Sequence, residues 1–137
     1  MGMGRNISPA RLWLTAAVLS HLGVSIAHGA AHTGARVPLS DAANLFVYIV
    51  ILVGPLAGLA LTWPSQRIGS WLIAITMAGS LVFGTVNHFV VASPDHVDHI
   101  APQWRPLFAT TAALLALTEV LGFGLAIRVV RGRKNGS

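Results

Sequence analysis

Residues 86–102, VNHFVVASPDHVDHIAP, concentrate side chains that can bind metal ions or transfer protons. Three of the protein's six histidines and two of its four acidic residues fall within twelve positions, at His88, Asp95, His96, Asp98 and His99. Imidazole and carboxylate groups together suit Zn²⁺, Cu²⁺ and iron. This stretch therefore indicates a metal or cofactor site in a chain that otherwise carries few polar groups.

A second group of histidines lies near the N-terminus. At 100° per residue, His21, His28 and His32 fall within about 40° of one another on a helix, and Ser25 borders the same stripe. His28 and His32 are four residues apart, so both side chains can reach one ion. No glutamate follows His28, so the pair does not have the HExxH pattern of metalloproteases.

Composition places these groups in a membrane protein. Charged residues make up 9 % of the chain and hydrophobic residues 54 %, whereas a soluble domain carries about 25 % charged residues. We expect a single domain of 137 residues. The absence of cysteine excludes disulfides and thiolate ligands. The basic residues lack the aromatic-interleaved face typical of nucleic-acid binding, so no nucleic-acid partner is expected.

Four apolar segments are long enough to cross a bilayer, which takes about 20 helical residues. They cover about residues 9–31, 41–62, 65–91 and 106–130. Ser8-Pro9 and Ser65 have the chemistry of helix starts. Because the links are short, the sequence predicts an all-α membrane protein, a bundle of four antiparallel transmembrane helices.

The basic residues predict an orientation. One side of the bundle collects Arg5, Arg11, Arg67, Arg128, Arg131, Arg133 and Lys134, whereas only Arg36 and Arg105 lie on the other. By the positive-inside rule both termini are cytoplasmic, and the bacterial inner membrane is the expected location. The tryptophans agree as an aromatic belt, with Trp13, Trp63 and Trp71 on the cytoplasmic side and Trp104 opposite.

Residues 5–33 also have features of a secretory signal peptide, namely two arginines, an apolar run and the small residues of AHGAAH. The apolar run is long for such a peptide and carries His21 in its middle. We therefore expect the segment to be retained as the first transmembrane span.

This orientation places five of the six histidines and three of the four acidic residues at the outer end. His28 and His88 should lie at similar depth, because the first and third helices run parallel. We expect a short interfacial helix over 94–101 in the second outer loop, with Ser93 as N-cap and Pro94 in its first turn. This helix contributes ligands only if it folds over the bundle.

Two ionisable residues are expected deep in the membrane. His21 lies near the middle of the first span and Glu119 near the middle of the fourth. A carboxylate at that depth is costly, so Glu119 should be protonated or paired, and His21 is the partner at matching depth. The pair predicts an interhelical hydrogen bond or, alternatively, a proton relay or cofactor contact. Pro55 should also free the carbonyl of Ile51 to accept from a neighbouring side chain.

Three functions remain open on this pattern. The first is a transition-metal site for zinc, copper or iron, used in metal handling or metal-dependent redox chemistry, with ligands drawn from His28, His32, His88, Asp95, His96, Asp98 and His99. The second is a b-type haem or quinone-interacting electron carrier with His28 and His88 as axial ligands. The third is a structural accessory subunit of a larger membrane complex or a homo-oligomer, with lipid as the main partner. Any enzymatic chemistry would come from the bound metal or cofactor, because no nucleophile–base pair is evident.

Overall fold

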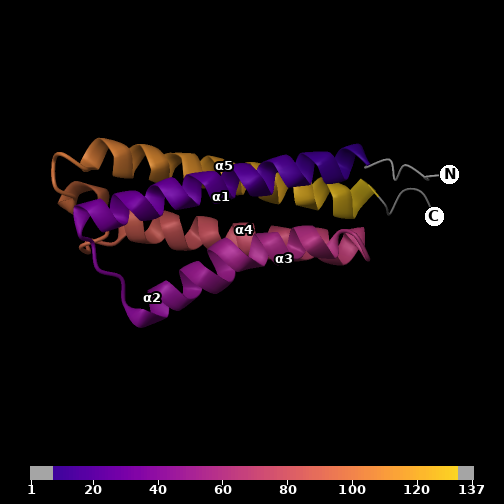
Figure 1. Ribbon diagram of the computed structural model, residues 1–137, viewed down its shortest axis with the longest axis horizontal. Helices are drawn as coiled ribbons and strands as arrows, with labels where there is room; N and C mark the ends of the chain where they lie inside the picture. The colour runs from indigo at the N-terminus through magenta and orange to yellow at the C-terminus, as the bar shows by residue number, and fades with distance from the viewer. Residues whose placement is uncertain (1–7, 133–137) are drawn as a thin grey trace.

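The computed structural model describes residues 8–132, and this part of the chain is a bundle of helices without strands (Figure 1). Four helical stretches are long and apolar enough to cross a membrane: Pro9–Ala35, Asp41–Leu61, Gln66–Val90 and Arg105–Gly132. The predicted all-α, four-span architecture is confirmed. Arg5, Arg133 and Lys134, used in the orientation argument, lie outside the described residues.

Serine side chains cap the N-termini of three helices. Ser8 caps α1 (Pro9–Ala35), Ser40 caps α2 (Asp41–Phe46) and Ser65 caps α4 (Gln66–Thr85), each by accepting a backbone N–H three residues ahead. This is the expected satisfaction of otherwise unpaired N–H groups at a helix start. The helix starts predicted at Ser8 and Ser65 are therefore confirmed.

The second span is not one regular helix. α2 continues into a π-helical segment, η1 (Val47–Val53), and then into α3 (Gly54–Leu61), with Pro55 in the first turn of α3. Proline has no N–H to donate, and π-helical turns widen the backbone locally. The span changes direction here, so that α3 lies along α4 while α2 stands away from the bundle (Figure 1).

Glycines hold α3 tightly against α4. A Cβ on Gly58 would meet Ile73 and the backbone of Gly69, and a Cβ on Gly69 would run into the Thr62 N and the Gly58 carbonyl. Only residues without a side chain allow two helix backbones to come this close, as in small-xxx-small membrane packing. The second span is thus anchored at one end and diverges at the other.

The bundle has two buried apolar clusters, one near each end. The larger lies toward the end where α1 begins and α5 (Arg105–Gly132) stops, and includes Leu14, Ile73 and Met77. The smaller, at the opposite end, joins Ala31, Phe108 and Ile100. The buried histidines described below lie beside this smaller cluster or deeper in the bundle.

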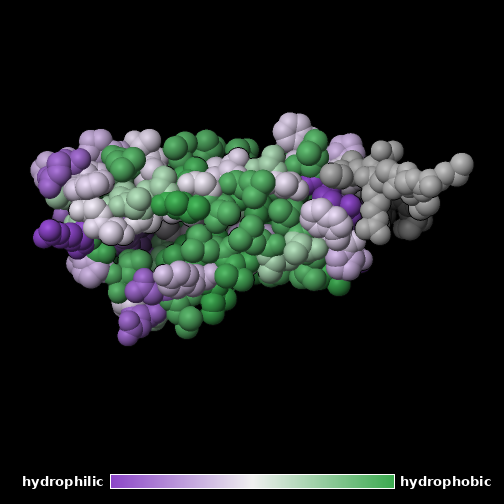
Figure 2. All heavy atoms as spheres, viewed as in Figure 1, coloured by the Kyte–Doolittle hydropathy of each residue, from purple (hydrophilic) through white to green (hydrophobic). Residues whose placement is uncertain are grey.

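Large apolar side chains cover the outside of the bundle. Ile75 and Val82, for example, are 63 % and 64 % exposed. Figure 2 shows hydrophobic residues along the middle of the molecule and hydrophilic residues concentrated near its ends. Such an exterior matches hydrocarbon, and together with the four long apolar helices it makes the chain an integral membrane protein.

The loop before α5 contains a short helix, shorter than the one predicted over 94–101. It is a single 3₁₀ turn, η3 (Val97–His99), preceded by a turn in which the Ser93 hydroxyl accepts the Asp95 N–H at 3.2 Å. His96 has an extended backbone (ψ 135°), which separates the two turns. The break lets Asp95 and Ile100 both point inward, where they are 7 % and 2 % exposed.

Substitution of Gly69 tests the close contact between α3 and α4. Gly69→Ala should destabilise the bundle by about 1–3 kcal/mol, the usual effect of overpacking, because the new methyl group meets backbone that cannot move aside. Gly124 is the matched control, since a Cβ there meets nothing within 4 Å. Thermal unfolding in detergent, followed by circular dichroism, should separate Gly69→Ala from Gly124→Ala. Equal midpoints would contradict this packing.

Candidate metal centre

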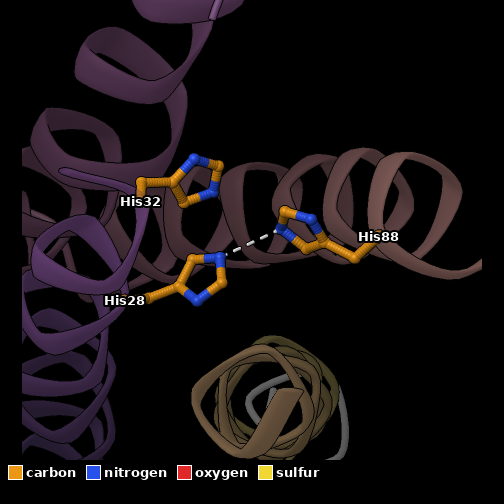
Figure 3. Close-up of side chains that lie close together, drawn as sticks. All are labelled: His28, His32 and His88. Atoms are coloured by element: carbon orange, nitrogen blue, oxygen red, sulfur yellow. Dashed lines mark hydrogen bonds between the residues drawn. The ribbon is translucent and has the colours of Figure 1, made fainter. Parts of the chain in front are cut away.

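Three histidines from two helices meet at the end of the bundle away from the start of α1. His28 and His32 lie on α1, and His88 lies on the π-helical segment η2 (Val86–Val90) that ends the third span. One nitrogen from each ring can be chosen so that all lie within 4.8 Å of one another. Figure 3 shows the three rings turned toward a common space. We call these three residues the trihistidine cluster.

A threonine on the neighbouring helix fixes the ring of His28. The Thr111 hydroxyl of α5 lies 2.8 Å from His28 Nδ1 and 2.8 Å from the Leu107 carbonyl. A hydroxyl has one proton, so two arrangements fit: Thr111 donates to Leu107 and accepts from His28 Nδ1, or Thr111 donates to His28 Nδ1 and the ring proton is on Nε2. Only the first arrangement leaves a lone pair on His28 Nε2 that faces the centre of the cluster, as metal binding requires.

Asp95 fixes the ring of His88 in the same way. His88 Nδ1 lies 3.2 Å from the Asp95 backbone carbonyl and 3.3 Å from its carboxylate Oδ1. Both atoms are acceptors, so His88 Nδ1 must be the donor, and its Nε2 also presents a lone pair. The Asp95 turn thus closes over the cluster, as it would for a loop that acts as a lid.

His28 and His88 face each other across the cluster. His28 Nε2 and His88 Nε2 are 3.1 Å apart, the contact drawn as a dashed line in Figure 3. His28 and His88 are only 6 % and 5 % exposed, so water screens this contact poorly. With the ring proton of His28 on Nε2 the contact is a hydrogen bond to His88, whereas with that proton on Nδ1 the two facing lone pairs suit a metal ion.

His32 completes the cluster and leaves polar atoms unpaired. Its Nε2 lies 3.3 Å from Asp95 Oδ1, and its ring packs edge-on against His28, with centroids 4.8 Å apart. Among residues 8–132, neither His32 Nδ1 nor Asp95 Oδ1 has a hydrogen-bond partner of good geometry, although both atoms are buried. Buried polar atoms are normally satisfied, so this corner of the bundle has capacity for a further group.

Phe108 forms an apolar wall on one side of the cluster. Its ring centroid lies 4.7, 4.8 and 5.2 Å from those of His28, His32 and His88, respectively. Ile100 packs behind it in the same buried group. Such a wall lowers the local dielectric and strengthens any interaction between the imidazoles and a cation.

The other predicted ligands lie outside this centre. The Asp98 side chain is 77 % exposed. His96 Nδ1 accepts the Asp98 N–H at 3.2 Å, which caps the 3₁₀ turn. His99 Nδ1 lies 2.6 Å from the Ser93 carbonyl and therefore donates to it. The structure assigns His96, Asp98 and His99 to the folding of the loop, and of this group only Asp95 reaches the trihistidine cluster.

The predicted intramembrane pair also comes together. His21 Nδ1 lies 4.0 Å from Glu119 Oε1, and both residues are buried. His21 Nε2 lies 3.1 Å from the Ile51 carbonyl, the group expected to be freed by Pro55. His21 therefore joins α1 to η1 at the level where the second span changes direction.

A cavity of about 420 Å³ lies between the trihistidine cluster and the deeper level of Glu119. It is bordered by all three cluster histidines and Asp95 at one end and by Glu119, Ser80 and Ile51 deeper in the bundle. The trihistidine cluster is therefore not a sealed core feature, because its ring atoms border a space large enough for a small ligand.

Thr111 and Phe108 are site residues that sequence reasoning did not identify. A threonine pair, Thr110-Thr111, on an otherwise apolar span was an available signal for Thr111. The π-helical geometry that orients His88 has no such signal in the sequence.

Comparisons with protein-family models, curated protein sequences and solved structures find no match to this chain. The candidate function is therefore argued from the site alone.

Thr111→Val tests the assigned orientation of His28. The substitution preserves shape but leaves the buried His28 Nδ1 without a hydrogen-bond partner, which should cost about 1–3 kcal/mol of stability. Thr110→Val, one residue away and exposed, should leave stability unchanged. Denaturant unfolding measures the difference, and nitrogen NMR of the wild type should show His28 protonated at Nδ1. Equal stability of the two variants would contradict the assignment.

Proposed function

We propose that the protein binds one divalent transition-metal ion through the trihistidine cluster, at the outer face of the membrane. The observation that carries the proposal is the 3.1 Å separation of His28 Nε2 and His88 Nε2, with the Nδ1 atom of each ring held by a partner on its far side. Two nitrogens bound tetrahedrally to one zinc ion, at about 2.0–2.1 Å each, lie about 3.3 Å apart. The observed distance is close to this value.

His32 supplies the third ligand, since one of its nitrogens lies within 4.8 Å of the other two. Binding of the ion would bring that nitrogen to about 3.3 Å from each of the other two. Three protein ligands leave one position of a tetrahedral ion open, as in catalytic rather than structural zinc sites. Because all three histidines border the cavity, this open position faces the cavity.

Thr111 and Asp95 orient the ligands in this proposal. A metal-bound histidine usually donates its other N–H to a carboxylate, carbonyl or hydroxyl, which fixes the ring and raises its basicity. Thr111 does this for His28 and Asp95 for His88, at 2.8 Å and 3.2–3.3 Å. Asp95 thus acts next to the ligands, and its carboxylate also balances part of the charge of the ion.

The donor set favours zinc, copper(II) or iron(II). Imidazole binds all three, whereas copper(I) prefers sulfur ligands, and the chain has no cysteine and only three methionines. Three ligands and an open position are compatible with two roles. The protein could bind and pass on the metal, or the metal could act on a molecule in the cavity.

The geometry gives the haem alternative less support. Two axial nitrogens on opposite sides of one iron must lie about 4 Å apart, with room for a macrocycle between the rings. His28 and His88 approach to 3.1 Å at an interplanar angle of 71°, and Phe108 packs against both rings. The residues present therefore do not fit an intervening porphyrin.

Metal content tests the proposal. Purified protein loaded with Zn²⁺ and then desalted should retain about one ion per chain, and His28→Ala and His88→Ala should each lose it. Asp95→Asn keeps the backbone carbonyl that faces His88 but removes the negative charge 3.3 Å from the His32 and His88 rings. It should weaken Zn²⁺ binding about 10–100-fold, the usual effect of losing an outer-shell carboxylate. Isothermal titration and elemental analysis measure both effects.

Asp98→Ala is the matched control, because Asp98 lies in the same loop but its side chain is 77 % exposed. It should bind Zn²⁺ as the wild type does. A metal-free wild type that copurifies with a fixed set of membrane proteins would instead favour the accessory-subunit function. A Soret band would restore the haem alternative.

We also propose that the protein lies in a bacterial inner membrane with both termini cytoplasmic. The support is that Arg11, Arg67, Arg128 and Arg131 gather at one end of the bundle, opposite the cluster. The exposed apolar faces suit lipid and leave room for a homo-oligomer or a larger complex.

Cysteine labelling tests this orientation, since the natural chain has no cysteine to interfere. Asp98→Cys and Arg67→Cys place one thiol at each end of the bundle, both at exposed positions. A membrane-impermeant maleimide added to spheroplasts should label Asp98→Cys at once and Arg67→Cys only after lysis. The reverse pattern would invert the proposed topology.

A further inference from the structure

The cavity beside the trihistidine cluster opens toward the side of the bundle. Ile26 of α1 and Tyr48 of η1 both border it, and they are 65 % and 61 % exposed. The mouth of the cavity therefore lies between α1 and the second span, on the apolar surface that faces lipid. On the other side the second span is closed against α4 by the stacked rings of Phe46 and Phe83, 4.6 Å apart.

The cavity exists because the second span is anchored at only one end. Gly58 and Gly69 hold α3 against α4, and η1 with Pro55 turns the rest of the span outward. His21 bridges α1 to the Ile51 carbonyl just below the opening. These contacts keep the space open as a built feature of the fold.

The residues that line the cavity favour an apolar occupant over an ion or a column of water. Apolar side chains form most of the wall, among them Leu52, Phe83, Ala112, Leu115 and Ala116. A hydrated ion would lose its water shell against such a wall at high cost. A molecule from the bilayer exchanges contacts with lipid tails for contacts with this wall, so the transfer of its apolar part costs little.

Glu119 gives the cavity a polar floor. The residue is 3 % exposed and borders the cavity, and its nearest charged or ionisable partner is His21 Nδ1 at 4.0 Å, beyond hydrogen-bond distance. No hydrogen bond found among residues 8–132 ends on its carboxyl group. Buried carboxyl groups without a donor are rare and costly, so a donor from the occupant would satisfy it.

We propose that this cavity binds a lipid-soluble molecule with an apolar body and a terminal hydroxyl or amino group that donates to Glu119. Glu119 follows Thr111 by eight positions on α5, and at about 1.5 Å per position this sets a length of about 12 Å between the cluster and the floor. A chain of about ten carbons spans it. The proposal goes beyond metal binding and does not require it.

Photolabelling with a long-chain alcohol that carries a diazirine tests the proposal, using protein in phosphatidylcholine nanodiscs. Mass spectrometry should locate saturable labelling at cavity residues such as Ile51 and Ala116. Unlabelled 1-decanol should compete about tenfold better than decane, the equivalent of one buried hydrogen bond to a carboxyl group. Glu119→Leu should abolish that difference.

Ala116→Phe fills the cavity and should reduce labelling about tenfold, whereas Ala113→Phe adds the same bulk at an exposed position of the same helix that does not border the cavity and should not. Gly84→Leu is a second filling variant, because a Cβ there meets only His88 Cδ2 at 3.9 Å. Circular dichroism confirms that each variant folds. Labelling spread over lipid-facing residues, or equal competition by decane and 1-decanol in the wild type, would overturn the proposal. Loss of Zn²⁺ binding in His88→Ala with labelling intact separates this site from the metal centre.

Discussion

The approach of His28 and His88 constrains the outer half of the protein more than any other contact. Two imidazole nitrogens lie 3.1 Å apart in a nearly dry environment, and each ring is held there by a hydrogen-bonding partner on its far side. Those partners come from α5 and from the loop before it. The first, third and fourth spans and the closing loop must all be in place for the contact to form.

The two ends of the bundle differ: one is filled by apolar packing, and the other holds the candidate site. The end where α1 begins is closed by Leu14, Ile73 and Met77 and by the glycine contact of α3 with α4. The other end holds the buried histidines, Asp95 and a cavity. Buried polar groups in a membrane protein must find partners within the bundle. His21 finds one in the Ile51 carbonyl, which Pro55 cannot bond because proline has no N–H.

Much of the fold and of the candidate site could be predicted from the sequence, and what could not be predicted has physical causes. The four spans follow from hydropathy, and the grouping of His28, His32 and His88 follows from helical period and depth. The sequence could not separate Asp95 from Asp98, because that choice depends on the extended backbone of His96, which breaks the expected helix into two turns. The two π-helical segments, one of which carries His88, and the partner role of Thr111 depend on tertiary contacts that no local pattern records.

X-ray absorption at the zinc edge of the loaded protein tests the central claim most directly, because it reports the atoms around the ion itself. We expect three imidazole nitrogens at about 2.0–2.1 Å, with one oxygen ligand in the fourth position. A shell of six oxygens, or one with fewer than three imidazoles, would contradict three-histidine binding and leave the close contact of His28 and His88 as a hydrogen bond between the two rings.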